Sequence, residues 1–240
     1  MYKTCLLFFI VLFTGYKSVV GQNAKADILR INDAYSKFSN MSMEITYKVF
    51  LNQTTTTPYE IETGSYKQNG NLRYSKLKQI ESLQNNNYLV VVDNDVKRIV
   101  VGNPVKFNPA KITLLNLDSA LSKCSAVNYI TGNSEQGGYS MVFKSNIVSE
   151  FDKVELYFNK KTYIVEKITF FYRQKIRLAT EENAVADRPK LEISFSKFNF
   201  TKNEDVAFFS EKKFIEKSKG SFVASSSYSD YKVIDQKFLK

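Results

Sequence analysis

Residues 153–173 read KVELYFNKKTYIVEKITFFYR, and this stretch decides the fold class. Val154, Leu156 and Phe158 alternate with polar or amphipathic side chains, which is the period of a strand with one buried face. A turn at residues 159–161 follows, and the return strand has apolar side chains at Ile164, Ile168, Phe170 and Tyr172. Two such strands joined by a short polar turn predict an antiparallel hairpin.

The same alternation recurs along most of the chain. Asn69-Gly70 lies between two of these segments and predicts a tight turn, because both residues tolerate positive φ. Roughly nine to eleven strands joined by short turns predict one large antiparallel sheet. Further strands are expected at Met43–Leu51, Tyr59–Lys67, Leu72–Leu83, Tyr88–Val92, Lys97–Val101, Tyr139–Lys144 and around Leu191, Ile193 and Phe195.

Two segments have the period of a helix instead. In residues 23–38 the apolar side chains recur three and four positions apart, and in residues 109–121 a proline stands at the first helical position. The predicted fold class is therefore mainly β (α+β): a single large curved antiparallel sheet or open half-barrel, covered by two or three helices. The apolar face of the first helix consists of Ile28, Ile31, Tyr35 and Phe38.

Residues 1–21 have the pattern of a secretory signal peptide: a basic start, a short apolar run and small residues before Gln22. We expect export to the periplasm, with cleavage before Gln22. Residues 22–216 then form one β domain, and residues 217–240 form a C-terminal tail. This tail is either loosely held or supplies one more docked segment through Val233, Ile234, Phe238 and Leu239.

Charge and composition exclude several functions. The formal charge of +10 falls to +8 on cleavage, 32 basic against 24 acidic residues, and the lysines are dispersed, so we expect no nucleic-acid partner.

The chain has no histidine, and Cys124 is the only cysteine that remains after cleavage. Ser194 and Lys197 match a Ser-x-x-Lys pattern, but they lie in a predicted strand without its companion motifs. We expect no enzyme, no metal, no cofactor and a monomer.

Three stretches resemble the LolA-like family of periplasmic lipoprotein carriers. They are GSYKQNGNLRYSKLKQIESLQNNNYLVVVDNDVKRIVV at 64–101, VELYFNKKTYIVEKITFFY at 154–172 and KLEISFSKFNFTKNEDVAFFSEKKF at 190–214. The resemblance implies a curved sheet with an apolar cavity under helices, and as partners the acyl chains of a lipid or lipoprotein. It also implies a membrane receptor or another envelope protein. The chain departs from the family at Gln68-Asn69, where the carriers commonly have an Arg-Pro pair.

A cavity of this kind would be lined by the alternating apolar side chains, which stabilise a ligand by about 25 cal/mol for each Å2 of apolar surface buried. The first hypothesis is a carrier or chaperone that holds acyl chains there. The alternative is a cell-envelope interaction or structural module whose sheet is filled by its own side chains. The candidate lining residues are Ile45, Tyr47, Val49, Leu89, Val91, Leu156, Phe158, Ile168, Phe170, Ile193 and Phe195.

Overall fold

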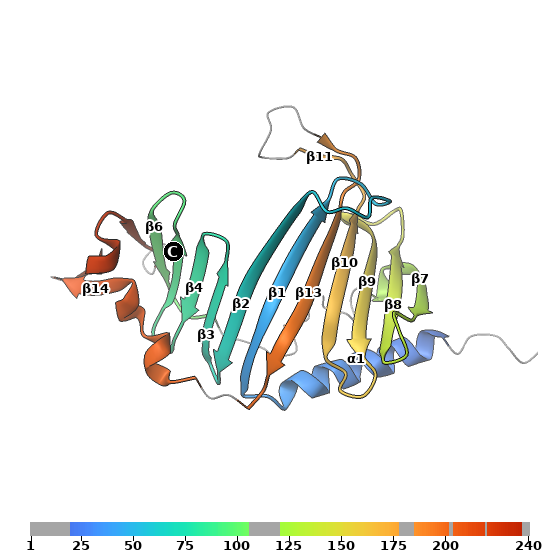
Figure 1. Cartoon of the computed structure of the whole chain (residues 1–240), viewed down its shortest axis with the longest axis horizontal. Helices are drawn as coiled ribbons and strands as arrows, with labels where there is room; N and C mark the ends of the chain where they lie inside the picture. Colours follow the sequence, from blue (N-terminus) through green and yellow to red (C-terminus); the bar gives the residue numbers. More distant parts are fainter. Residues whose placement is uncertain (1–19, 106–120, 178–184, 202–203, 219, 237–240) are drawn as a thin grey trace, which may run out of the picture.

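The structure is a computed structural model that describes residues 20–105, 121–177, 185–201, 204–218 and 220–236. Its main feature is one twelve-stranded sheet that curves and stays open (Figure 1), which confirms the predicted fold class. The strands lie in the order β16 (Lys232–Asp235), β6 (Arg98–Gly102), β5 (Leu89–Asp93), β4 (Ile80–Gln84), β3 (Leu72–Leu77), β2 (Glu60–Asn69), β1 (Asn40–Phe50), β13 (Lys190–Asn199), β10 (Val165–Tyr172), β9 (Phe151–Asn159), β8 (Gln136–Phe143) and β7 (Cys124–Ile130).

Neighbouring strands pair antiparallel, except that β16 runs parallel to β6. The hairpin that the stretch 153–173 predicts is present as β9 and β10, with Leu156 opposite Ile168. A bulge between Val165 and Lys167 shifts the register, so that Val165 stands opposite Phe158. The turn predicted at Asn69-Gly70 joins β2 to β3, and Gly70 has the positive φ of 57° that this turn requires.

One predicted strand is wrong: Leu72–Leu83 is two strands, not one. β3 ends at Leu77 and β4 begins at Ile80, with Lys76 opposite Glu81. The chain reverses at Lys78, which has a left-handed φ of 50°. This turn contains no glycine, asparagine or proline, so the sequence pattern carries no signal for it.

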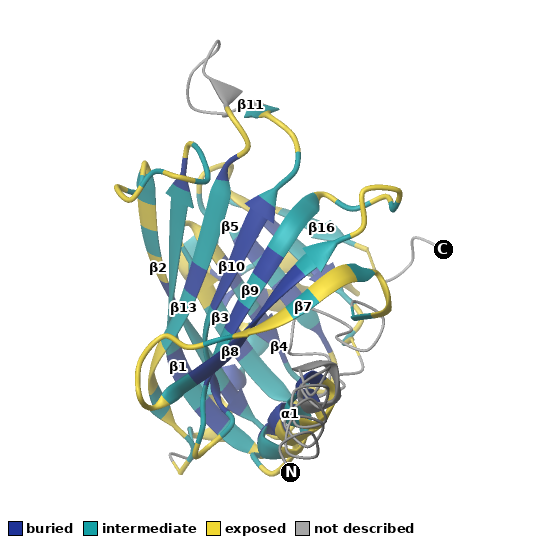
Figure 2. Cartoon of the chain, turned by 90° about the vertical axis from the view of Figure 1, so that its right-hand side faces the viewer, coloured by how far each residue is buried: buried dark blue, intermediate teal, exposed yellow. Residues whose placement is uncertain are grey.

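The helix α1 (Val20–Ser36) lies on the concave side of the sheet (Figure 2). Its buried residues are three and four positions apart, which places them on one helical face as predicted. These are Ala24, Ile28, Ile31 and Tyr35. Phe38, just beyond the helix, stacks on Phe200 with ring centroids 3.9 Å apart. Within the described ranges α1 is the one complete α-helix, and Leu121 and Ser122 are the described end of another. No helix in these ranges combines the length and apolar character needed to cross a bilayer. The helix predicted at 109–121 lies outside the described residues up to position 120.

Two hydrophobic cores lie on opposite faces of the sheet. The first joins α1 to the inner, concave face of β1, β8, β9, β10 and β13. The second includes Leu83, Val90 and Val101, which face one another on adjacent strands. Val91 and its partner Ser82 lie on the inner face of the sheet. Successive residues of a strand point to opposite faces, so their chain neighbours Val90 and Leu83 point to the outer face. The second core is therefore on the outer face.

The C-terminal segment covers this outer core. It runs through the 3-10 turns η3 (Val206–Phe209), η4 (Glu211–Lys213) and η5 (Ser226–Tyr228), the hairpin β14 (Ile215–Ser218) and β15 (Ser221–Ala224), and then β16. Phe209, Phe214 and Ile215 are each at most 1% exposed. Of the two possibilities for the tail, the docked one is present, since Val233 and Ile234 pair with β6. Phe238 and Leu239 lie outside the described residues.

The polar stretch 174–189 leaves the sheet at the end of β10. Its ends form a separate pair of short strands, β11 (Ile176–Arg177) and β12 (Val185–Ala186), which project beyond the rest of the sheet (Figure 1). Residues 178–184 between them are outside the described residues.

Candidate functional site

All eleven predicted lining residues lie on the inner face of the sheet. The register carries one row of them across four strands: Leu156 opposite Ile168, Ile168 opposite Ile193, and Ile193 opposite Tyr47. Val91 reaches the same face through Ser82, Ser75 and Tyr66, each directly opposite the next. The sequence therefore assigned the correct face on both halves of the sheet.

The eleven divide into two groups by burial. Five are at most 6% exposed and belong to the core under α1: Leu156, Phe158, Ile168, Phe170 and Ile193. The other six remain partly exposed: Ile45, Tyr47, Val49, Leu89, Val91 and Phe195. Only the second group is accessible to solvent in the structure.

Polar contacts fasten α1 over the first group. The Tyr139 hydroxyl on β8 donates to Asp27 Oδ2 at 2.8 Å, and Arg30 donates both to Asp27 Oδ1 at 3.1 Å and to the Tyr163 hydroxyl at 3.0 Å. Near the end of the helix, the Val165 N–H donates to the Tyr35 hydroxyl oxygen at 3.2 Å. Burial raises the pKa of Tyr35 to about 12, so this phenol stays neutral at physiological pH.

Beyond α1, the inner face of β3, β5, β6 and β16 has a set of apolar side chains that we call the inner-face patch. Its members are partly exposed and belong to neither hydrophobic core. Three of them were not predicted, and one of these comes from the C-terminal strand, whose parallel pairing the sequence does not reveal. The inner-face patch consists of Leu77, Leu89, Val91, Val100 and Ile234.

Gly64 connects the inner-face patch to the apolar residues of β1. It stands directly between Ile45 on β1 and Leu77 on β3. A Cβ added at Gly64 would lie 2.5 Å from the Lys76 carbonyl oxygen, so the position accepts only glycine without a backbone shift. Because Gly64 has no side chain, the surface of the inner face is depressed between the side chains of Ile45 and Leu77.

A polar row borders the inner-face patch. Gln68, Arg73 and Gln84 stand opposite one another on β2, β3 and β4. The Gln84 amide donates to the Val105 carbonyl oxygen at 3.0 Å and accepts from the Val105 N–H at 3.1 Å, which fixes the chain just after β6. Burial lowers the pKa of Arg73, although the neighbouring Tyr66 opposes this effect. Sequence reasoning missed this row because it searched for apolar alternation.

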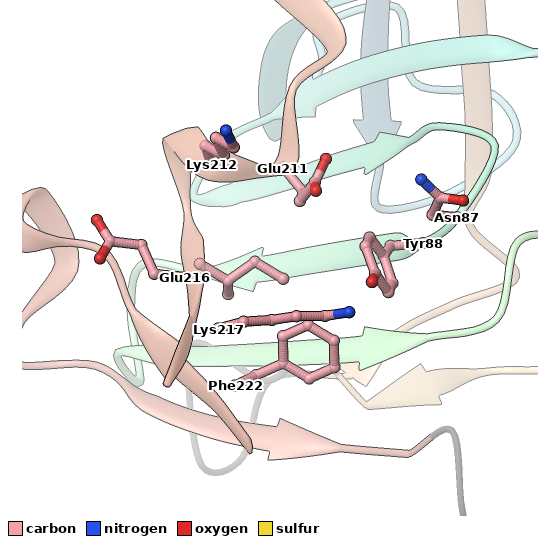
Figure 3. A pocket seen from close by; sticks show the side chains of 8 residues that line it. Asn87, Tyr88, Glu211, Lys212, Glu216, Lys217 and Phe222 are labelled. Atoms are coloured by element: carbon pink, nitrogen blue, oxygen red, sulfur yellow. The ribbon is translucent and has the colours of Figure 1, made fainter. Parts of the chain in front are cut away.

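A separate cavity of about 420 Å3 lies on the outer side, between the start of β5 and the C-terminal hairpin (Figure 3). The rings of Tyr88 and Phe222 meet edge to face at 5.2 Å, and the Lys217 ammonium lies 5.6 and 5.8 Å from their centroids. A hydrogen bond with Tyr88 raises the pKa of Lys217. Glu211 accepts from the Asn85 amide at 2.6 Å. The lining residues are Asn87, Tyr88, Glu211, Lys212, Ile215, Glu216, Lys217 and Phe222.

Several polar side chains that could carry chemistry have structural surroundings instead. Lys197 pairs with Glu44 at 2.8 Å, away from its motif partner Ser194. Asp93 accepts from the N–H groups of Asp95 and Val96, which makes this stretch a turn. Burial raises the pKa of the Cys124 thiol, with Lys144 opposing, so the unreactive thiol form is favoured. Among the described residues, no group of three or more His, Cys, Asp or Glu side chains is arranged to hold a metal ion.

No protein-family model and no curated protein matches the chain. Solved structures do resemble it. An uncharacterized conserved protein from Thermus thermophilus has 12% identity over 89% of this chain and 99% of its own, with a TM-score of 0.46. A LolA superfamily protein from Nitrosomonas europaea has 9% identity over 81% and 99%, with a TM-score of 0.32. A putative outer membrane lipoprotein-sorting protein domain from Vibrio parahaemolyticus has 10% identity over 77% and 95%, with a TM-score of 0.33. LolA superfamily proteins are thus among the structures similar to this chain, as the sequence resemblance predicted, but these similarities assign it neither ligand nor activity.

Proposed function

We propose that this protein is an exported carrier that holds an acyl chain of a lipid or lipoprotein against the inner face of its sheet. The observation that carries the proposal is the inner-face patch: five apolar side chains on one face of the sheet, partly exposed and outside both hydrophobic cores. Three of them, Val91, Val100 and Ile234, stand directly opposite one another on adjacent strands. Apolar surface of this kind on a concave face favours an apolar occupant.

The free energy available sets the kind of ligand. Each buried methylene contributes about 0.8 kcal/mol, and micromolar affinity corresponds to about 8 kcal/mol. About ten methylenes supply that amount before the cost of ordering the ligand, so the occupant has to be a long acyl chain. Short apolar metabolites would bind too weakly to be carried.

In this proposal α1 acts as a cover. The acyl chain first contacts the inner-face patch and the partly exposed residues of β1, such as Ile45 and Val49. The five predicted residues that are now buried come into reach only when α1 moves, because they belong to the same hydrophobic core as its apolar face. Release of the ligand is the reverse step, in which α1 settles again on Leu156 and Ile168.

Export through the expected signal peptide is part of the same proposal. Cleavage before Gln22 removes only the first two residues of α1. The described buried side chains of the helix, Ala24, Ile28, Ile31 and Tyr35, all follow the cleavage point, so their packing on the sheet is retained. A periplasmic carrier also needs a donor and an acceptor of its ligand. In this proposal a membrane receptor or another envelope protein fills that role, and the partner is still to be identified.

Displacement of a fluorescent fatty acid from the chain beginning at Gln22 tests the carrier. The variant Val91→Asp places a carboxylate in the inner-face patch and should weaken binding at least ten-fold. Ile61→Asp is the matched control, because Ile61 is 55% exposed and lies on the outer face opposite Lys48. Absence of saturable binding at micromolar probe would reject the carrier, as would equal binding by the two variants. Substitution of Phe158 or Phe170 is unsuitable, since both are buried and their loss would unfold the protein.

One observation favours the alternative function, an envelope interaction module with a self-filled core. Part of the inner face is already occupied, since side chains of α1 such as Ile28 and Ile31 share one core with those of β8, β9, β10 and β13. For such a module the fatty acid would not bind, and the unfolding free energy would be the only property that substitutions under α1 change.

A further inference from the structure

The strand β7 forms one edge of the sheet, and α1 contacts it. Within the described residues it pairs only with β8. Its seven residues, CSAVNYI, include no charge and no proline, and Ser125, Ala126, Asn128 and Tyr129 are exposed. The opposite edge, β16, has four residues and carries Lys232 and Asp235 at its ends. Proteins usually guard edge strands with charges, proline or short length, because an unguarded edge pairs with other chains.

The hydrogen bonds at the start of β7 show which backbone groups point outward. The Lys144 N–H donates to the Lys123 carbonyl oxygen at 3.1 Å, and the Ser125 hydroxyl donates to the Val142 carbonyl oxygen at 3.2 Å. The backbone N–H and C=O groups of Val142 therefore point toward β7. Those of Ser140, two residues earlier, do the same, because backbone groups alternate in direction along a strand. On β7, the backbone groups of their partners Ala126 and Asn128 point toward β8. The backbone groups of Val127 and Tyr129 point outward.

Lysines lie at both ends of this edge. Lys123 and Lys144 are adjacent at the start of β7. At the other end, Lys160 donates to the Ser134 carbonyl oxygen and Lys161 pairs with Glu135, both across the turn that follows β7. Glu135 is the one acidic residue of segment 121–144. The edge thus has an uncharged centre between two positive ends.

We propose that β7 binds an extended segment of a partner polypeptide, which adds to the sheet as a further antiparallel or parallel strand. The segment has an uncharged, β-prone centre that pairs with Val127 and Tyr129, and acidic residues at its ends that meet the lysines. A second copy of this chain fits less well. Antiparallel pairing of β7 with itself places the Lys123 end of one copy beside the Lys161 end of the other, and these like charges repel.

This edge is separate from the inner-face patch, which lies at the opposite end of the sheet order. Strand addition uses main-chain hydrogen bonds and needs no cavity. The inference therefore holds whether or not the carrier proposal does.

The probe is a fluorescein-labelled peptide in which alternating valine and threonine residues lie between two pairs of aspartates. We expect saturable binding by fluorescence anisotropy, weakened by salt. Amide hydrogen exchange followed by NMR gives the decisive readout. The N–H groups of Val127 and Tyr129 should exchange rapidly in the free protein and at least ten-fold more slowly with the peptide, whereas those of Ala126 and Asn128 should be protected in both states.

Matched controls separate pairing from general attraction. The same peptide N-methylated at alternate residues keeps its charge but cannot form a ladder, so it should not protect the two amides. The variant Lys123→Glu/Lys161→Glu should weaken the acidic peptide at least five-fold, while Lys212→Glu, at an exposed position on the C-terminal segment, should leave binding unchanged. The proposal would be overturned by binding that does not protect the Val127 and Tyr129 amides, or by no binding at millimolar peptide. It would also be overturned if these amides became protected at high protein concentration without peptide, because the added strand would then come from a second copy of this chain.

Discussion

At the scale of single residues, Glu81 connects the C-terminal segment to the sheet. It is 5% exposed and accepts hydrogen bonds from the Tyr74 hydroxyl at 2.7 Å and from the Lys213 ammonium at 3.1 Å. Burial alone would raise the pKa of Glu81, but these two hydrogen bonds and the positive charges of Lys213 and Lys76 together outweigh it and lower the pKa. Burial, together with the same contact, raises the pKa of Tyr74. The pair is therefore a neutral phenol and a charged carboxylate.

This arrangement predicts a specific loss of stability in acid. Because the pKa of Glu81 is lower in the folded state, its contribution is complete above the ordinary value of 4.5 and is lost as pH falls through the lowered value. Glu81→Gln should reduce the unfolding free energy by about 1–3 kcal/mol at neutral pH and flatten its decline in acid. Urea unfolding followed by circular dichroism measures both effects. Glu216→Gln, at an exposed position, is the control, and an unchanged acid profile in Glu81→Gln would contradict the assignment.

At the scale of elements, the attachment of α1 decides how easily the inner face opens. Its apolar face packs on the sheet, while Asp27 gives it a polar anchor by accepting from Tyr139, whose side chain is only 1% exposed. A buried hydroxyl that loses its acceptor costs more than the bond itself contributed. The hydrogen bond between Tyr139 and Asp27 therefore helps to hold the helix in one position, and removing it should release the helix.

Asp27→Ala should loosen α1 without unfolding the sheet. We expect a decrease of about 1–3 kcal/mol in the unfolding free energy, faster amide exchange along the helix and, if the carrier proposal holds, several-fold faster association of the fatty-acid probe in stopped flow. Asp33→Ala is the control on the same helix. Asp33 forms an exposed i,i+4 pair with Lys37 at 2.6 Å, worth less than about 0.5 kcal/mol. Equal effects of the two substitutions would show that Asp27 is not an anchor.

At the scale of the whole molecule, one sheet carries two cores on opposite faces, each sealed by a segment distant in sequence. α1 covers the inner core, and residues 205–235 cover the outer one. Fully burying one large apolar side chain contributes about 1.5–3 kcal/mol. Phe209, Phe214 and Ile215 together therefore contribute roughly 5–9 kcal/mol, an amount comparable to the whole stability of a domain.

A chain that ends at Phe200 should accordingly give no soluble folded monomer. It would expose Tyr74, Leu83, Val90 and Val101 on the outer face of four strands. A chain that ends at Gln236 keeps the described C-terminal contacts and should behave like the full chain. Size-exclusion chromatography and binding of a hydrophobic dye distinguish the two. A stable monomer ending at Phe200 would show that the C-terminal segment is a dispensable appendage.

The sequence by itself determined the local features of this fold. Alternation in β1, β9, β10 and β13, the helical spacing of Ile28, Ile31 and Tyr35, and the turn at Gly70 each follow from backbone geometry that a few neighbouring residues set. The same alternation placed all eleven predicted lining residues on one face of the sheet, because a strand in regular register keeps its faces.

Only the tertiary structure decided which faces are sealed. The strand LVVVD of β5 has apolar side chains on both faces. The local sequence therefore does not indicate that Val90 and Val92 are buried while Leu89 and Val91 stay partly exposed. That difference is set by Phe209 and Phe214, more than a hundred residues away, which pack on the outer face, and by the limited reach of α1 on the inner one. Burial depends on contacts between distant segments, and periodicity reports only which side chains share a face.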